Sequence, residues 1–218
     1  MQKYLSLYPL PINFVLMKPW FFIFFLLPLL GFAYVVWHVW QILPLSPSWK
    51  GAVVGLMLLS VVCLFSHFLI GPDSLPLAAG RVVYEVGTSS LFILLYLVMI
   101  FLLLDIGRLV RLVPPSFLHH SVAGSVGILL FVCALFVYAN ANYRNKQMRT
   151  MELHAARPLS SPMRIVMLSD MHIGYHNPVK ELARWVDMIN AASPDVVLIA
   201  GDIIDGSMKP LREENMAA

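Results

Sequence analysis

The sequence predicts an α-helical multi-pass membrane region with four transmembrane helices, followed by one β-α-β unit of an α/β domain. Of its 218 residues, 59% are hydrophobic and only 12% are charged, whereas about 25% are charged in an ordinary soluble domain. Up to Tyr143 the only acidic residues are Asp73, Glu85 and Asp105. Beyond Pro162, two short apolar runs flank a helix-like segment, which is typical of a β-α-β unit.

Four apolar stretches are long enough to cross a bilayer, which takes roughly 20 residues. They cover about residues 20–43, 52–70, 86–104 and 122–139. Helix-breaking residues lie between them: Pro44, Pro47, Gly71, Pro72, Pro114 and Pro115. The first stretch is too long for the apolar core of a signal peptide and no small-residue cleavage site follows, so we expect it to be retained.

These stretches divide the chain into three predicted parts. Residues 1–143 form the transmembrane region, 144–162 a basic juxtamembrane linker, and 163–218 a water-facing segment. The linker either lies against anionic headgroups or acts only as a positive stop signal, and we prefer the second interpretation. Met17-Lys18-Pro19 resembles a natural start, so residues 1–16 are expected to be an upstream extension.

Lysine and arginine residues predict the orientation in the membrane. With four spans, both ends of the chain lie on one side. That side carries six basic residues: Lys3, Lys18, Arg81, Arg144, Lys146 and Arg149. The other side carries three: Lys50, Arg108 and Arg111. The excess favours a cytoplasmic C-terminal segment in a multi-pass cell-membrane protein with membrane lipids as partners, and no nucleic-acid binding is predicted.

The water-facing segment begins with the apolar run 164–168, which predicts a buried parallel strand. Asn177 and Pro178 are expected to cap and start a helix. Its apolar positions recur at helical spacing and are expected to face the sheet: Val179, Leu182, Val186 and Ile189. The run 195–200 predicts a second buried strand, parallel to the first.

Polar side chains follow both predicted strands. Asp170 and His172 come after the first strand, and Asp202 comes after the second. Neighbouring strands lie about 4.8 Å apart, so ligands at matching ends can reach a common ion. Carboxylate and imidazole ligands suit manganese, iron or zinc better than calcium. Taken singly, each of these residues is an ordinary turn or loop residue, and Asp205 can simply brace the turn at Gly206.

The clusters Ser169-Asp170-Met171-His172 and Gly201-Asp202-Ile203-Ile204-Asp205 resemble the first two signatures of the calcineurin-like metallophosphoesterases. The resemblance covers about residues 163–218, and the four-span layout is similar to that of membrane-anchored bacterial members. It implies an α/β sandwich and a two-metal site that hydrolyses phosphomonoesters or phosphodiesters. By resemblance, Asp170 and His172 hold the first of two divalent ions, Asp202 bridges both, and Asp205 is a second-shell or turn residue.

Members of that family continue with a Gly-Asn-His signature, a further histidine and a Gly-His-x-His signature, none of which follows Asp205. We therefore expect the chain to be a C-terminally truncated fragment. The general-acid histidine is expected in the missing part, which leaves no catalytic residue within the chain. The expected substrate is a phosphoester, lipid- or nucleotide-linked. The alternative is a non-catalytic multi-pass membrane protein with a short soluble interaction stub.

Overall fold

The computed structural model describes residues 19–154 and 160–216. Predictions for the extension 1–16, for Lys3 and Lys18, and for part of the linker lie outside these ranges. The helical region contains α1 (Pro19–Ile42), α2 (Pro47–Leu69), the short 3-10 helix η1 (Pro72–Ser74), α3 (Leu77–Leu109), the 3-10 helix η2 (Pro115–Leu118) and α4 (Val122–Arg144). The water-facing segment contains β1 (Ile165–Leu168), α5 (Val179–Ala191), β2 (Val196–Ile199) and α6 (Lys209–Glu213). This order confirms the predicted fold class.

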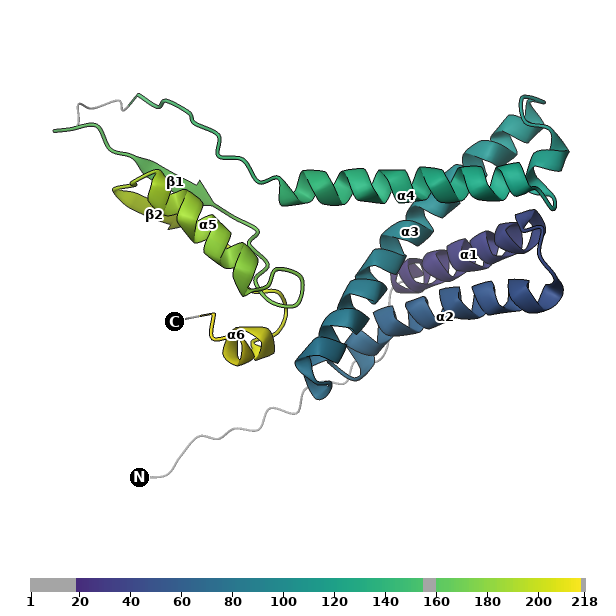
Figure 1. Ribbon diagram of the computed structural model, residues 1–218, viewed down its shortest axis with the longest axis horizontal. Helices are drawn as coiled ribbons and strands as arrows, with labels where there is room; N and C mark the ends of the chain where they lie inside the picture. The colour runs from purple at the N-terminus through teal and green to yellow at the C-terminus, as the bar shows by residue number, and fades with distance from the viewer. Residues whose placement is uncertain (1–18, 155–159, 217–218) are drawn as a thin grey trace.

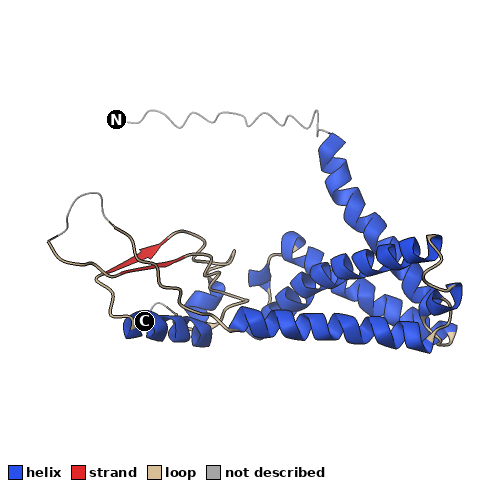
Figure 2. Ribbon diagram, turned by 90° about the horizontal axis from the view of Figure 1, so that it is seen from above, coloured by secondary structure: helices blue, strands red, loops and turns tan. Residues whose placement is uncertain are grey.

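The helices pack as a bundle from which α4 extends. Helices α1 and α2 lie side by side and α3 crosses both, while α4 runs from the far end of the bundle toward the water-facing segment (Figure 1). The two strands lie at one end of an elongated molecule and the apolar helices at the other (Figure 2). Among the described residues, α2, α3 and α4 are long and apolar enough to cross a membrane, and α1 contributes a shorter apolar stretch, Leu26–Ile42.

Helix α3 is longer than the span predicted at 86–104. Its 33 residues correspond to about 50 Å of helix, whereas the hydrocarbon core of a bilayer is about 30 Å thick. The prediction found only the apolar middle, because charged residues ended the window on both sides. Arg81 and Glu85 belong to the first turns of α3, and Asp105 and Arg108 to its last turns.

The helices of the bundle approach closely at small residues. A Cβ atom added to Gly87 of α3 would lie 2.8 Å from Leu64 Cα of α2, so only glycine permits this crossing. One turn later, Ser90 Oγ donates a hydrogen bond to Ser60 O over 3.3 Å. The apolar core lies where α1, α3 and η2 meet, and its buried members are Val35, Ile42, Phe101 and Leu118.

His38 is a packed residue with a polar partner. Its side chain is 2% exposed and stacks on Phe101 with 4.5 Å between ring centroids. Its Nε2 atom lies 3.0 Å from Asp105 Oδ2, an oxygen that also accepts a hydrogen bond from Tyr34. Asp105 and Arg108 pair at 3.4 Å, as their helical spacing predicts. This cluster joins α1 to α3 at the end of the bundle away from the strands.

Strands β1 and β2 are parallel, with Ile165 opposite Val196 and Leu168 opposite Ile199. The prediction that both strands are buried is wrong for the described residues, because Val197 is 44% and Ile199 48% exposed. Parallel strands become buried when helices cover both faces of their sheet. In the described residues both strands are largely exposed, so most of the apolar surface of this two-stranded sheet is left open.

Asn177 does not cap the helix that follows it, so that prediction is also wrong. Helix α5 begins at Val179 after Pro178, and no side chain at the N-cap position accepts a hydrogen bond. The Val179 backbone N–H instead donates to Glu214 Oε2 over 3.3 Å. The Asn177 amide is directed into the loop that follows β1.

Candidate metal centre

Backbone hydrogen bonds hold together the two loops that follow the strands. Ala200 N donates to Leu168 O at 2.9 Å, where the strands end. Beyond that point, His172 N donates to Asp202 O at 2.9 Å and Ile173 N to Ile203 O at 2.8 Å. The parallel pairing is thus extended past the sheet, and this places the polar residues of the two loops side by side.

The structure brings Asp170, His172 and Asp202 together. Each offers one ligand atom, and these atoms all lie within 4.8 Å of one another. Two atoms bound to one ion at 2.0–2.2 Å lie at most about 4.4 Å apart, so small side-chain adjustments bring the three donors into range. Two carboxylates and an imidazole form a donor set suited to manganese, iron or zinc. The residues present therefore fit a divalent metal ion.

The three grouped residues share an uncommon backbone conformation. The φ angles of Asp170, His172 and Asp202 are 54°, 43° and 49°, in the left-handed region. Asp and His are enriched among the non-glycine residues found there, yet the conformation still costs free energy. Strained residues of this kind cluster at functional sites, where the surrounding structure holds them in place. In this chain the extended backbone pairing supplies that support.

Asp205 lies outside the group of three. Its backbone N–H donates to Ile173 O at 3.0 Å, and its Cβ atom would lie 3.4 Å from a Cβ added to Gly174. Its Oδ2 atom is buried and has no hydrogen-bond partner among the described residues. The Asp205 side chain also lies beside the Tyr84 phenol of α3, close enough for an electrostatic interaction. Its second-shell role stays a prediction.

Asn177 is a residue whose contribution the sequence interpretation missed. Its Nδ2 atom donates to Met171 O at 2.9 Å and to His172 O at 3.3 Å, and the side chain is 2% exposed. The amide thereby closes the loop that carries Asp170 and His172. An Asn before a Pro is a common cap signal, so the local sequence pointed to the wrong partner.

Two more missed residues come from the helical region. The Tyr143 hydroxyl, at the end of α4, donates to Asn177 Oδ1 at 3.1 Å and accepts from Asn177 Nδ2 at 2.9 Å. Asp73, in η1, accepts a hydrogen bond from the Tyr175 hydroxyl at 3.3 Å and another from Ser207. Burial, together with the nearby Asp73 carboxylate, raises the pKa of the Tyr175 phenol. Both residues lie far in sequence from the loops that they contact.

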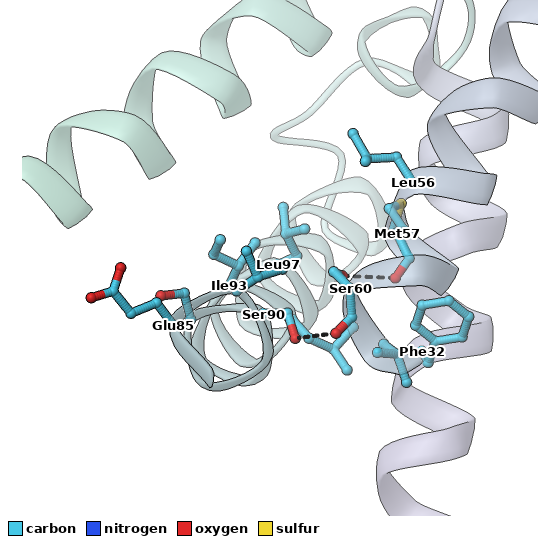
Figure 3. Close-up of a pocket in the computed structure, with 12 residues that line it drawn as sticks. Phe32, Leu56, Met57, Ser60, Glu85, Ser90, Ile93 and Leu97 are labelled. Atoms are coloured by element: carbon cyan, nitrogen blue, oxygen red, sulfur yellow. Dashed lines mark hydrogen bonds between the residues drawn. The ribbon is translucent and has the colours of Figure 1, made fainter. Parts of the chain in front are cut away.

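A cavity in the helical region is not part of this centre. It has a volume of about 510 Å³ and lies between α1, α2 and α3, lined mainly by apolar side chains such as Phe32, Met57 and Leu97 (Figure 3). Glu85 and Ser90 are among its few polar lining residues. None of the grouped Asp and His residues lines it, so the cavity and the candidate metal centre are separate.

Comparison with known proteins identifies the C-terminal segment. Residues 163–217 match the calcineurin-like phosphoesterase family. The chain is 32% identical over 85 residues to an uncharacterized metallophosphoesterase of Campylobacter jejuni. It is 44% identical over 50 residues to a zebrafish (Danio rerio) protein, and 35% identical over 60 residues to a Bos taurus protein. Both of the latter are named "transmembrane protein with metallophosphoesterase domain". No solved structure matches.

These matches cover limited parts of the proteins compared. They include 38%, 23% and 28% of the present chain, respectively. They make up 23%, 11% and 14% of the lengths of those relatives, so the chain spans less than a quarter of each of the three.

Proposed function

Since the chain carries a calcineurin-like metallophosphoesterase domain at its C-terminus, behind apolar helices, we propose that it is the membrane-anchored part of a metal-dependent phosphoesterase. The observation that supports this most directly is the group Asp170, His172 and Asp202, with ligand atoms within 4.8 Å of one another. In the proposed enzyme these residues would hold the divalent metal ions, with Asp202 as the ligand shared between them.

When bound in such a site, divalent ions would supply charge that orients a phosphoester and stabilises its in-line displacement. The residues of this chain would bind the metal ions and fix their positions. Asp170 and Asp202 supply carboxylates, His172 supplies an imidazole nitrogen, and the paired loop backbones fix their spacing. Among the described residues, no further histidine or acid belongs to this group. We therefore expect the 218-residue chain to bind metal without turnover.

The membrane helices support a substrate that is presented at the bilayer surface, such as a lipid-linked phosphodiester, although a nucleotide-linked substrate has the same reacting group. The excess of lysine and arginine on the side that carries the water-facing segment supports a cytoplasmic site. Arg81 and Arg144 lie at that end, where they contact Glu214 and Arg184. Lys50 and Arg108 lie at the other end of the bundle.

The proposal is tested in two steps. Electron paramagnetic resonance (EPR) titration of the purified chain in lipid nanodiscs is expected to show bound Mn²⁺, and Asp202→Ala is expected to weaken this binding by more than about 100-fold. A protein that also carries the rest of the domain is expected to hydrolyse bis-p-nitrophenyl phosphate or p-nitrophenyl phosphate when loaded with Mn²⁺. If Asp202→Ala hydrolyses these substrates as fast as the unaltered enzyme, the assigned role of Asp202 is refuted.

The exposed sheet supports a second candidate function. Both strands of the described sheet present apolar side chains to the outside, and such a surface favours association with another polypeptide. In this case the C-terminal segment is a non-catalytic interaction stub. Mn²⁺ titration distinguishes the two candidate functions. The enzyme is expected to bind Mn²⁺ at Asp170, His172 and Asp202, whereas a non-catalytic stub is not.

A further inference from the structure

The buried part of the water-facing segment lies in its loops rather than in its strands. Met171, Ile173 and Tyr175 are 7%, 5% and 0% exposed, whereas the strand residues are open. These three side chains alternate along the loop that begins with Asp170. Residues of this loop contact the end of the helical bundle, and these contacts contribute to its burial.

The first such contact joins α4 to the loop. Tyr143 and Asn177 are linked by hydrogen bonds of 2.9 and 3.1 Å, and the Tyr143 ring lies 5.2 Å from that of His176. Asn177 in turn holds the carbonyl oxygens of Met171 and His172. The Tyr143 hydroxyl, at the end of α4, is therefore connected to the backbone of the candidate metal ligand His172 through the side chain of Asn177.

The second contact joins the α2–α3 connection to the same loop. Asp73 accepts hydrogen bonds from Tyr175 and Ser207, and Arg81 Nε donates to Tyr175 O at 3.3 Å. Tyr84 stacks on Tyr175 with 5.7 Å between ring centroids. Tyr175 of the loop and Ser207, which follows Gly206, are thus both bound to the helical region.

The third contact is an ion pair on the neighbouring surface. Arg81 Nη2 lies 2.6 Å from Glu214 Oε1, and the other Glu214 oxygen accepts from the first turn of α5. Lys209 Nζ reaches the carbonyl oxygens of Asp73 and Leu75 at 2.9 and 2.5 Å. A covalent connection alone would hold the water-facing segment at the membrane, so these charged and polar contacts do more than attach it: they fix its position on the helical region.

From these contacts we propose that the membrane helices position the metal-ligand loop, and that Tyr143 acts through Asn177 as a positioning residue for His172. This inference rests on the proposed metal site for its functional meaning. It gives the four-helix region a role that a single anchoring helix lacks, because the α4 terminus and the α2–α3 connection hold the loop from two directions.

The first test needs no metal. Amide hydrogen exchange of the metal-free chain in nanodiscs is compared for the unaltered protein, Tyr143→Phe and the control Tyr138→Phe. Tyr143→Phe keeps the ring and removes the hydroxyl, while Tyr138 is an exposed tyrosine on the same helix. We expect exchange of the peptide 171–177 to quicken about tenfold in Tyr143→Phe only. Equal exchange in all three proteins would overturn the positioning role.

The second test measures Mn²⁺ affinity by EPR titration of the same three proteins. Loss of a partner that orients a metal ligand costs about 10–100-fold in affinity. Because Tyr143 acts one residue further away, we expect Tyr143→Phe to raise the Mn²⁺ Kd by about 3–10-fold and Tyr138→Phe to leave it unchanged. A Kd unchanged in Tyr143→Phe contradicts the inference.

The two tests separate this inference from the proposed function. If the unaltered chain binds no Mn²⁺ while Tyr143→Phe still speeds exchange at 171–177, the metal site is wrong and the positioning contact is right. If Mn²⁺ binds normally and exchange is unaffected by Tyr143→Phe, the site stands and the membrane region does not position it.

Discussion

The backbone amide of His172 donates to the carbonyl oxygen of Asp202 over 2.9 Å, so two candidate ligands from different strands are joined through their main chains. Their side chains therefore do not depend on a metal ion to meet. A site preorganised in this way spends less of its metal-binding free energy on ordering the loops.

The first prediction concerns the candidate metal ligands themselves. Asp202→Ala removes a carboxylate for which the group of candidate ligands contains no replacement among the described residues. Loss of a residue that only orients a metal ligand costs about 10–100-fold in affinity, so we expect the loss of a ligand itself to lower the Mn²⁺ affinity more than about 100-fold. Isothermal titration calorimetry measures this. Asp187→Ala, on the exposed side of α5, is the matched control and is expected to bind as the unaltered chain does.

The second prediction concerns the left-handed backbone at Asp202. Glycine adopts this conformation without the Cβ penalty, so Asp202→Gly is expected to be about 1 kcal/mol more stable against loop opening than Asp202→Ala. At the helical position Asp187 the order reverses, because glycine is about 1 kcal/mol worse than alanine there. Hydrogen exchange of the four variants gives both differences. The same order at both positions would contradict the strain at Asp202.

The third prediction concerns the Arg81–Glu214 ion pair. Glu214→Gln removes the charge but keeps a hydrogen-bonding side chain, so we expect the contact between α3 and α6 to weaken by about 1 kcal/mol. Exchange rates of residues 209–216 measure the loss. Glu213→Gln is the control, because Glu213 is more exposed and lies 3.8 Å from Lys209. Equal effects of the two substitutions would show that Glu214 has no special role.

The fourth prediction concerns alkaline pH. The pKa of Tyr175 is raised in the folded protein by burial and by Asp73. The neutral phenol is thus favoured by folding, and this contribution is complete below the unfolded pKa of about 10 and decreases as the pH rises above it. We expect the loop contact to weaken above about pH 10 in the unaltered chain and less steeply in Tyr175→Phe. Thermal unfolding from pH 8 to 11 in detergent checks this.

The sequence predicted the features that depend on local pattern. Apolar length located the helices, and the runs before Asp170 and Asp202 located two parallel strands whose ends bring the candidate ligands together. It did not predict the partners of Asn177 or Tyr175, because Tyr143 and Asp73 lie on segments whose approach depends on tertiary packing. The predicted burial of β1 and β2 failed for a related reason, since a strand's own residues do not show whether both faces of its sheet are covered.

Helix α4 ends at the residues that hold the ligand loop, yet it packs only lightly on the bundle. Of its residues, Gly124 and Val132 are buried, while Leu129, Leu130 and Val137 are exposed. Its 23 residues form a rod of about 35 Å, so a 10° change of tilt displaces its end by about 6 Å. Transmembrane helices tilt to match bilayer thickness. We therefore expect the Mn²⁺ affinity of the site to change with lipid acyl-chain length, which titration in nanodiscs made of short-chain and long-chain phospholipids measures.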